Sequence, residues 1–174
     1  MTRTLKGVAL LVLVQGVLVL AYLQLKKPGN ADHEAPLSIA EPSRVERAFP
    51  TITVENRRGD RFPLPLDSRP TIVHIWATWC PPCRAELPGL LALDRQGQKV
   101  FAVAMDPDWN DIEEFFSGEV PPEVVLGDPD ELRGQLRTTT LPVTFFVSRG
   151  GSAYLRFDGA RDWQSETFRK RWLE

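Results

Sequence analysis

The stretch Ile75-Trp76-Ala77-Thr78-Trp79-Cys80-Pro81-Pro82-Cys83 decides the fold, because it holds both cysteines of the chain in a Cys-x-x-Cys spacing. It overlaps the end of Thr71–Ala77, a β-branched and apolar run that is typical of a central strand buried on both faces. It precedes Ala85–Gln96, which we expect to be helical. A Cys-x-x-Cys pair at a strand-to-helix junction is typical of thiol–disulfide exchange.

The chemistry of the pair follows from its place at a helix N-terminus. Cys80 would lie near unpaired backbone N–H groups and the positive end of the helix dipole, which both favour its thiolate. Cys83 lies one turn further on, near enough to close a disulfide. We therefore expect Cys80 to be the exposed attacking sulfur and Cys83 the buried resolving one. Pro81 and Pro82 suit the first helical turn, where a missing N–H costs little.

Two other roles for the cysteine pair have less support. A zinc site needs further soft ligands, and His33 and His74, the only histidines, lack the spacing of zinc fingers. A structural disulfide across two residues would close a trivial loop and constrain the unfolded chain little. We expect no metal site, and no cofactor beyond a redox-active Cys80–Cys83 disulfide.

The body of the chain, residues 47–174, alternates strand and helix patterns. Thr51–Val54 and Arg61–Leu66 predict a β pair around the turn Arg58-Gly59-Asp60. Beyond the motif, the pattern predicts strands at Lys99–Met105, Val124–Leu126, Val143–Val147 and Ala153–Phe157, and helices at Asp111–Ser117, at Asp130–Arg137 and from an Asp162 cap to about Trp172. This order implies an α/β fold with a central mixed β-sheet flanked by helices.

The motif resembles the thioredoxin-fold signature. More closely, Ala77–Pro88 is similar to the TlpA/ResA-type thiol-disulfide oxidoreductases, which are membrane-tethered bacterial proteins. The resemblance covers about Phe49–Glu174. It implies a thioredoxin-like fold with an N-terminal β extension and a central αβ insertion around Asp111–Leu126.

The resemblance also implies roles for residues outside the cysteine pair. Pro142 matches the family's cis-proline, in a loop that faces the cysteines and offers backbone groups to a substrate. Leu141 departs from the threonine that many relatives carry. With Trp79 and Pro81, these two residues form the expected substrate-binding set. Glu86 matches a glutamate that tunes the protonation of the pair in ResA-like proteins; its alternative is a solvated helix carboxylate.

His74 is the most unusual residue near the motif. It stands six residues before Cys80, where thioredoxin has a buried aspartate and many TlpA-type proteins have asparagine. Strand alternation places it on the same face as Trp76 and Thr78. Two interpretations stay open, a catalytic proton acceptor for Cys83 and a neutral core histidine bonded to a neighbouring carbonyl.

The N-terminal region has the features of a membrane anchor. Gly7–Leu25 is 19 residues long without a charge, close to the length that spans a bilayer. We predict an anchor over residues 1–27, a flexible tether over 28–46 and the thioredoxin-like domain over 47–174. A cleaved signal peptide is the alternative, although its core is usually shorter. Arg3 and Lys6 favour a cytoplasmic N-terminus with the rest of the chain exported. Together with the resemblance, this implies a single-pass protein of the bacterial inner membrane with its catalytic domain in the periplasm.

The balance of charged residues argues against one class of function, nucleic-acid binding. Lys and Arg number 21 against 23 Asp and Glu, so the basic excess of a nucleic-acid binder is missing. We therefore expect no nucleic-acid partner. The resemblance to TlpA/ResA-type proteins implies protein thiol or disulfide substrates and a membrane electron donor of the DsbD/CcdA type.

The direction of electron flow follows from the helix start. Pro82 lacks the N–H that would help stabilise a Cys80 thiolate, and a less stabilised thiolate makes a weaker oxidant. We therefore expect a reductase of protein disulfides. A disulfide-forming oxidase and a non-catalytic thioredoxin-fold binding or chaperone module remain alternatives. The substrate stays open among apocytochrome c, which would place the protein in cytochrome c biogenesis, a copper-site protein and oxidised periplasmic thiols.

Overall fold

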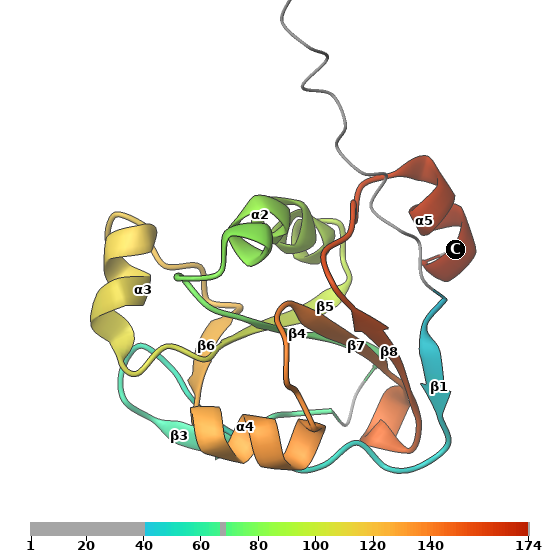
Figure 1. The fold of residues 1–174 in the computed structure, drawn as a ribbon, viewed down its shortest axis with the longest axis horizontal. Coiled ribbons are helices and arrows are strands. Elements are labelled where there is room, and N and C mark those ends of the chain that lie inside the picture. Colours follow the sequence, from blue (N-terminus) through green and yellow to red (C-terminus); the bar gives the residue numbers. More distant parts are fainter. Residues whose placement is uncertain (1–40, 67–68, 174) are drawn as a thin grey trace, which may run out of the picture. The chain divides into compact units, whose positions relative to one another are not determined.

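The apolar run before the cysteine pair forms β4 (Thr71–Trp76), the central strand of a mixed sheet, and all six of its residues are buried. A computed structural model describes residues 41–66 and 69–173, which belong to one compact unit of the chain. Within these residues the sheet has eight strands in the order β1-β8-β7-β4-β5-β6-β2-β3 (Figure 1).

The two neighbours of β4 set its register beside the motif. β5 (Lys99–Ala104) runs parallel to β4, and β7 (Val143–Val147) runs antiparallel to it. His74 is therefore paired with Ala102 on one side and with Thr144 on the other. The predicted mixed sheet is confirmed.

The sheet continues outward on both sides of this centre. On one side lie β6 (Val124–Gly127) and the antiparallel pair β2 (Thr53–Glu55) and β3 (Arg61–Pro63), which confirms the predicted β extension. On the other side lies β8 (Tyr154–Asp158), joined to β7 by a turn that contains the short 3-10 helix Arg149–Gly151.

The edge strand β1 (Ser43–Val45) lies within the segment that was predicted to be a flexible tether. It pairs antiparallel with β8, although residues 28–46 were expected to be flexible. Pairing at a sheet edge uses backbone groups, so an exposed segment without an apolar period can form it. The rest of the tether and the anchor lie in residues 1–40, outside the described part of the chain. No helix within 41–66 and 69–173 has the length and apolarity to span a bilayer.

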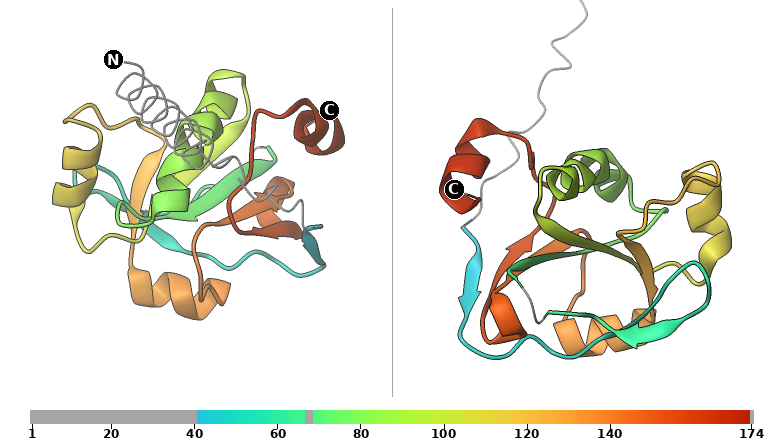
Figure 2. Two further views of the ribbon diagram at one scale, coloured as in Figure 1. Left: turned by 45° about the horizontal axis from the view of Figure 1, so that its top comes forward. Right: turned by 180° about the vertical axis from the view of Figure 1, so that it is seen from behind.

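Helices cover both faces of the sheet and divide the core in two. On one face lie α2 (Pro81–Arg95), α3 (Trp109–Phe115) and α5 (Glu166–Trp172), whose buried side chains pack around Trp76. On the opposite face lies α4 (Pro129–Leu136), whose Leu132 and Leu136 pack with Val73 and Ile75 (Figures 1 and 2). The α/β sandwich predicted from the order of elements is therefore confirmed.

Two helix starts differ from those predicted. Helix α2 begins at Pro81 rather than Ala85, because Cys80 is its N-cap and both prolines fit the first turn. Helix α5 begins after Ser165, whose Oγ accepts a hydrogen bond from Phe168 N at 3.3 Å. Asp162 instead accepts from Gln164 N at 3.0 Å in the preceding turn, so its predicted role as the cap of α5 is wrong.

Candidate active site

The two cysteines form a disulfide at the N-terminus of α2, as their spacing predicts. Cys80 is the N-cap, and its Sγ accepts from Cys83 N at 3.3 Å. The exposed fraction is 5% for Cys80 and 0% for Cys83. In this disulfide state Cys80 is less exposed than expected. It is nevertheless the one of the two that lines a surface groove.

This groove has a volume of about 440 Å³ and joins the start of α2 to the loops after β5 and α4. Its described lining residues are Trp79, Cys80, Pro81, Pro82, Met105, Arg133, Thr138, Thr139, Thr140 and Leu141. Among the described residues, Trp79 is the only large hydrophobic side chain that is exposed, at 59%. The groove thus combines an accessible aromatic side chain with the edge of the disulfide.

The proline predicted to face the cysteines has the predicted geometry. The Leu141–Pro142 peptide bond is cis, and Pro142 is buried at the start of β7. Leu141, Trp79 and Pro81 all line the groove. Three of the four expected substrate-binding residues therefore surround Cys80, and the fourth, Pro142, follows directly after Leu141.

A second group lies beneath the cysteines, on the buried face of α2. Glu86 is one turn after Cys83 and is 7% exposed, so the alternative of a solvated carboxylate is wrong. Its Oε1 lies 3.5 Å from Nε2 of His74, and its Oε2 accepts from Arg161 N at 2.6 Å. Nδ1 of His74 pairs with Oγ1 of Thr144 at 2.8 Å, and not with a carbonyl. Both predicted polar residues are thus brought together behind the disulfide.

Comparison with known proteins agrees with this geometry. No protein-family model matches the chain. A thiol:disulfide interchange protein DsbE of Yersinia pestis is 29% identical over 161 residues, covering 86% of this chain and 84% of the relative. The DsbE of Pseudomonas fluorescens biotype C is 30% identical over 138 residues, covering 72% of this chain and 75% of the relative.

The chain belongs to the DsbE family of thiol:disulfide interchange proteins.

The crystal structure of a DsbE-type protein from Chlorobium tepidum has the same fold. Its TM-score is 0.63 at 24% identity, with 74% of this chain and 95% of that chain covered. The thioredoxin-like fold expected from the motif is therefore confirmed, and so is the relationship to TlpA/ResA-type oxidoreductases. As a DsbE-family member, the chain is a thiol-disulfide oxidoreductase whose Cys-x-x-Cys pair is Cys80 and Cys83.

Burial changes the protonation of the two polar residues in opposite ways. It raises the pKa of Glu86 to about 7, while the hydrogen bond from Arg161 N and the nearby Trp163 indole act to lower it. It lowers the pKa of His74 to about 3. His74 is therefore neutral near pH 7, which favours its interpretation as a neutral core histidine. Glu86 exchanges its proton in the range where thiol chemistry operates.

The loop before Cys80 is held by a residue that the sequence did not single out. Asp106 is buried after β5, and both its carboxylate oxygens accept from Thr78 N at 3.2 Å. Oδ1 of Asp106 also accepts from the Thr78 hydroxyl. Burial raises the pKa of Asp106, against the effect of these hydrogen bonds. In the sequence, Asp106-Pro107 indicates only the end of a strand.

The groove residues Met105, Arg133 and Thr138–Thr140 were also missed. The threonines stand directly before Leu141, so their position next to the family's cis-proline was a usable signal. Met105 ends a predicted strand, and Arg133 reads as an ordinary charge on a solvated helix. Only the fold reveals that these two residues face Cys80.

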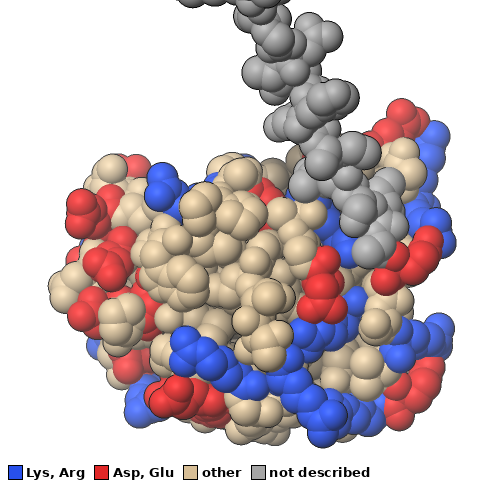
Figure 3. All heavy atoms as spheres, in the orientation of Figure 1, with Lys and Arg blue, Asp and Glu red and all other residues tan. Residues whose placement is uncertain are grey.

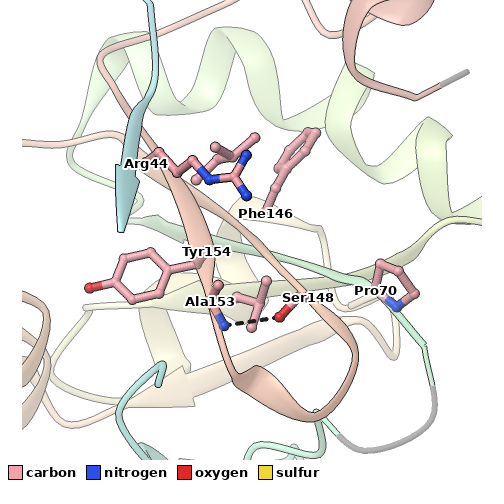
Figure 4. A pocket seen from close by; sticks show the side chains of 8 residues that line it. Arg44, Pro70, Phe146, Ser148, Ala153 and Tyr154 are labelled. Atoms are coloured by element: carbon pink, nitrogen blue, oxygen red, sulfur yellow. Dashed lines mark hydrogen bonds between the residues drawn. The ribbon is translucent and has the colours of Figure 1, made fainter. Parts of the chain in front are cut away.

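A second hollow of about 250 Å³ lies over β7 and β8 (Figure 4). Phe146, Leu155 and Arg44 are among its lining residues, and the hydrogen bond from Ala153 N to Ser148 Oγ closes its turn at 3.0 Å. None of the predicted site residues lines it, so it is separate from the cysteine pair.

Proposed function

We propose that this oxidoreductase is an exported, membrane-anchored reductase of protein disulfides. The observation that supports the proposal most strongly is the difference in surroundings between Cys80 and Cys83. Cys80 borders an open groove next to cis-Pro142, whereas Cys83 is fully buried and lies one helical turn before the buried Glu86. An accessible sulfur and an inaccessible partner are what a two-step exchange with a large substrate requires.

In the first step, the reduced Cys80 attacks one sulfur of the substrate disulfide. A bond forms between Cys80 Sγ and that sulfur while the substrate's own S–S bond breaks. The second substrate sulfur leaves as a thiolate and takes a proton from water. The helix N-terminus favours the attacking thiolate, because the Cys83 N–H points at Cys80 Sγ.

In the second step, Cys83 resolves the mixed disulfide. Its burial disfavours the thiolate, so its proton needs an acceptor within the protein. We assign this role to Glu86, one turn along α2, whose raised pKa of about 7 suits it to accept the proton. The Cys83 thiolate then displaces the substrate sulfur from Cys80. The displaced sulfur leaves as a thiolate and takes a proton from water, and Glu86 later releases the Cys83 proton to water. The Cys80–Cys83 disulfide has formed, and the substrate has gained two electrons and two protons.

His74 acts here as a positioning residue. Thr144 fixes the imidazole through Nδ1, and Nε2 faces Oε1 of Glu86 at 3.5 Å. A neutral ring at this distance adds no charge next to the carboxylate, so Glu86 keeps the raised pKa that burial gives it.

The start of α2 supports the reducing direction. The side chain of Cys80 accepts from Cys83 N, and the prolines at the two positions between them have no N–H to offer. A thiolate with fewer donors is less stabilised, and the corresponding disulfide is a weaker oxidant. The apolar segment Gly7–Leu25 supports the anchor, which would keep the domain close to a membrane electron donor of the DsbD/CcdA type.

Equilibration of the protein with glutathione redox buffers tests the direction. We expect a potential more negative than about −180 mV, whereas a value near about −120 mV would make the protein an oxidase. Cys83→Ser should accumulate a mixed disulfide with a peptide disulfide, and Cys80→Ser should not. Absence of turnover with dithiols and of any trapped complex would favour the binding-module alternative.

A further inference from the structure

We propose that the groove beside Cys80 selects polypeptides that carry an acidic side chain close to the disulfide cysteine under attack. The inference rests on the proposed function, because it concerns the substrate of the same cysteine pair. It adds no new chemistry: two electrons still pass from the dithiol to the substrate disulfide. What it adds is a charge preference in the step that forms the mixed disulfide.

The first observation is the single charge in the groove. Arg133 on α4 is the only charged side chain among the described lining residues, although the chain as a whole has a net charge of −2. The rest of the described lining is apolar or carries hydroxyl groups. A substrate segment next to Cys80 therefore meets a cation without a neighbouring lining carboxylate.

The second observation is that Arg133 has only a weak partner in the described structure. Nη1 of Arg133 lies 3.1 Å from Oδ1 of Asp130, and the exposed side-chain fractions are 54% and 96%. Such an exposed pair contributes little energy, so its arginine can turn to another carboxylate. Asp130 does not line the groove, whereas Arg133 does. Asp130 is therefore a competitor that a bound substrate must displace.

The third observation is an unused hydrogen-bonding group in the wall of the groove. Thr138 is 4% exposed, and its Oγ1 has no hydrogen-bond partner among the described residues. A buried hydroxyl without a partner is unusual in a folded protein. An extended peptide lying between Arg133 and Leu141 offers backbone groups that can pair with it. This favours a polypeptide as the occupant of the groove.

Figure 3 shows how charged side chains are distributed over one face of the domain. A broad uncharged area occupies the middle of the face drawn in Figure 3, and basic side chains run along its lower border. Acidic side chains lie on the left-hand side of this face, next to basic ones at its lower left, and again on its right-hand side (Figure 3).

The test uses the reduced full-length protein and synthetic disulfide peptides that are identical except for Glu, Gln or Lys near the cysteine. We measure the second-order rate at which each peptide oxidises the protein. With Glu at the favoured position, we expect a rate about fivefold higher than with Lys, since an exposed charge pair contributes modestly. The ratio should fall towards one as salt is added.

Variants assign the preference to the arginine. Arg133→Gln should bring the Glu-to-Lys ratio close to one, Arg133→Lys should keep most of it, and Asp130→Asn should increase it. Arg149→Gln is the matched control. Arg149 is exposed and follows the C-terminal end of β7, whereas Pro142 precedes the N-terminal end of that strand. Its ratio should equal that of the wild-type protein.

The outcomes separate the two proposals. If none of the peptides oxidises the protein, the proposed reductase function fails. If all peptides react at equal rates, or if Arg133→Gln keeps the full ratio, the reductase stands and the charge preference is wrong. An equal loss of the ratio in Arg149→Gln would also contradict a specific role for Arg133.

Discussion

Cys80 and Cys83 are three residues apart on the same helix, yet their surroundings differ in almost every respect. Cys80 caps the helix and borders a groove that contains one exposed tryptophan and one arginine. Cys83 is fully buried, on the same helix face as Glu86, which in turn contacts His74. One sulfur thus faces substrates and the other faces a buried pair of titratable groups.

The difference shows how one helical turn separates two chemical tasks. Attack on a protein disulfide needs access for a large molecule and a stabilised thiolate. Resolution needs a proton acceptor that works away from bulk water. The helix supplies both, because its N-terminus meets the groove while its buried face carries Glu86 at the next turn after Cys83.

The largest expected effect is on the pH dependence of the free energy of unfolding, which reflects the burial of Glu86. Its pKa is 4.5 when exposed and about 7 in the folded protein. Between these values the unfolded chain releases the proton and the folded chain keeps it, so stability falls as pH rises. Glu86→Gln removes this dependence. Relative to wild type, the variant should gain about 3 kcal/mol of unfolding free energy between pH 4 and pH 8.

Urea denaturation of the oxidised proteins at several pH values measures this difference. The matched control is Glu119→Gln, which removes an exposed carboxylate. Its difference from wild type should change little over the same range. A constant difference for Glu86→Gln would mean that the buried carboxylate ionises at its ordinary pH.

The next effect distinguishes the attack by Cys80 from the resolution by Cys83. Glu86→Gln should slow resolution of a preformed mixed disulfide about 10- to 100-fold, because it deletes the assigned proton acceptor. The initial attack by Cys80 should change much less. Stopped-flow resolution rates against pH test this, since the increase near pH 7 that we expect for wild type should be missing in the variant. Equal slowing of both steps would contradict a role confined to Cys83.

The smallest effect concerns His74. Because its pKa is lowered to about 3, it takes no proton near neutral pH. His74→Asn should therefore change the resolution rate at pH 8 by less than about threefold, an expectation that rests on general-base catalysis by Glu86 alone. The same stopped-flow assay measures it, on protein shown to be folded by its melting curve. A tenfold or larger loss would return the role of proton acceptor to His74.

Much of the fold followed from local patterns in the sequence. The buried strand Thr71–Trp76 is recognisable as a β-branched and apolar run, and the β pair before it by the turn residues between its strands. The start of α5 was missed, because Asp162 and Ser165 are both good capping residues and tertiary packing decides between them. Strand β1 was missed because an edge strand needs only a partner's backbone.

The site was predictable where the cysteine motif or the family supplied a signal. Cys80, Cys83, Glu86 and Pro142 were identified in this way, and their geometry agrees with the expectation except that Cys80 is less exposed in the disulfide state. The protonation of His74 was not predictable, because it depends on complete burial among groups from several elements. Arg133 and Asp106 were missed for a related reason, since only the packing of distant segments brings Arg133 to the groove and Asp106 to Thr78.

The most direct test of the contrast between the two sulfurs is alkylation of the reduced protein. Iodoacetamide is added near neutral pH under native conditions, and peptide mapping follows the labelling of each cysteine with time. We expect Cys80 to be labelled at least tenfold faster than Cys83, because its thiolate is favoured at the helix start and it borders the groove. Faster labelling of Cys83 would reverse the roles of the two cysteines and contradict the account.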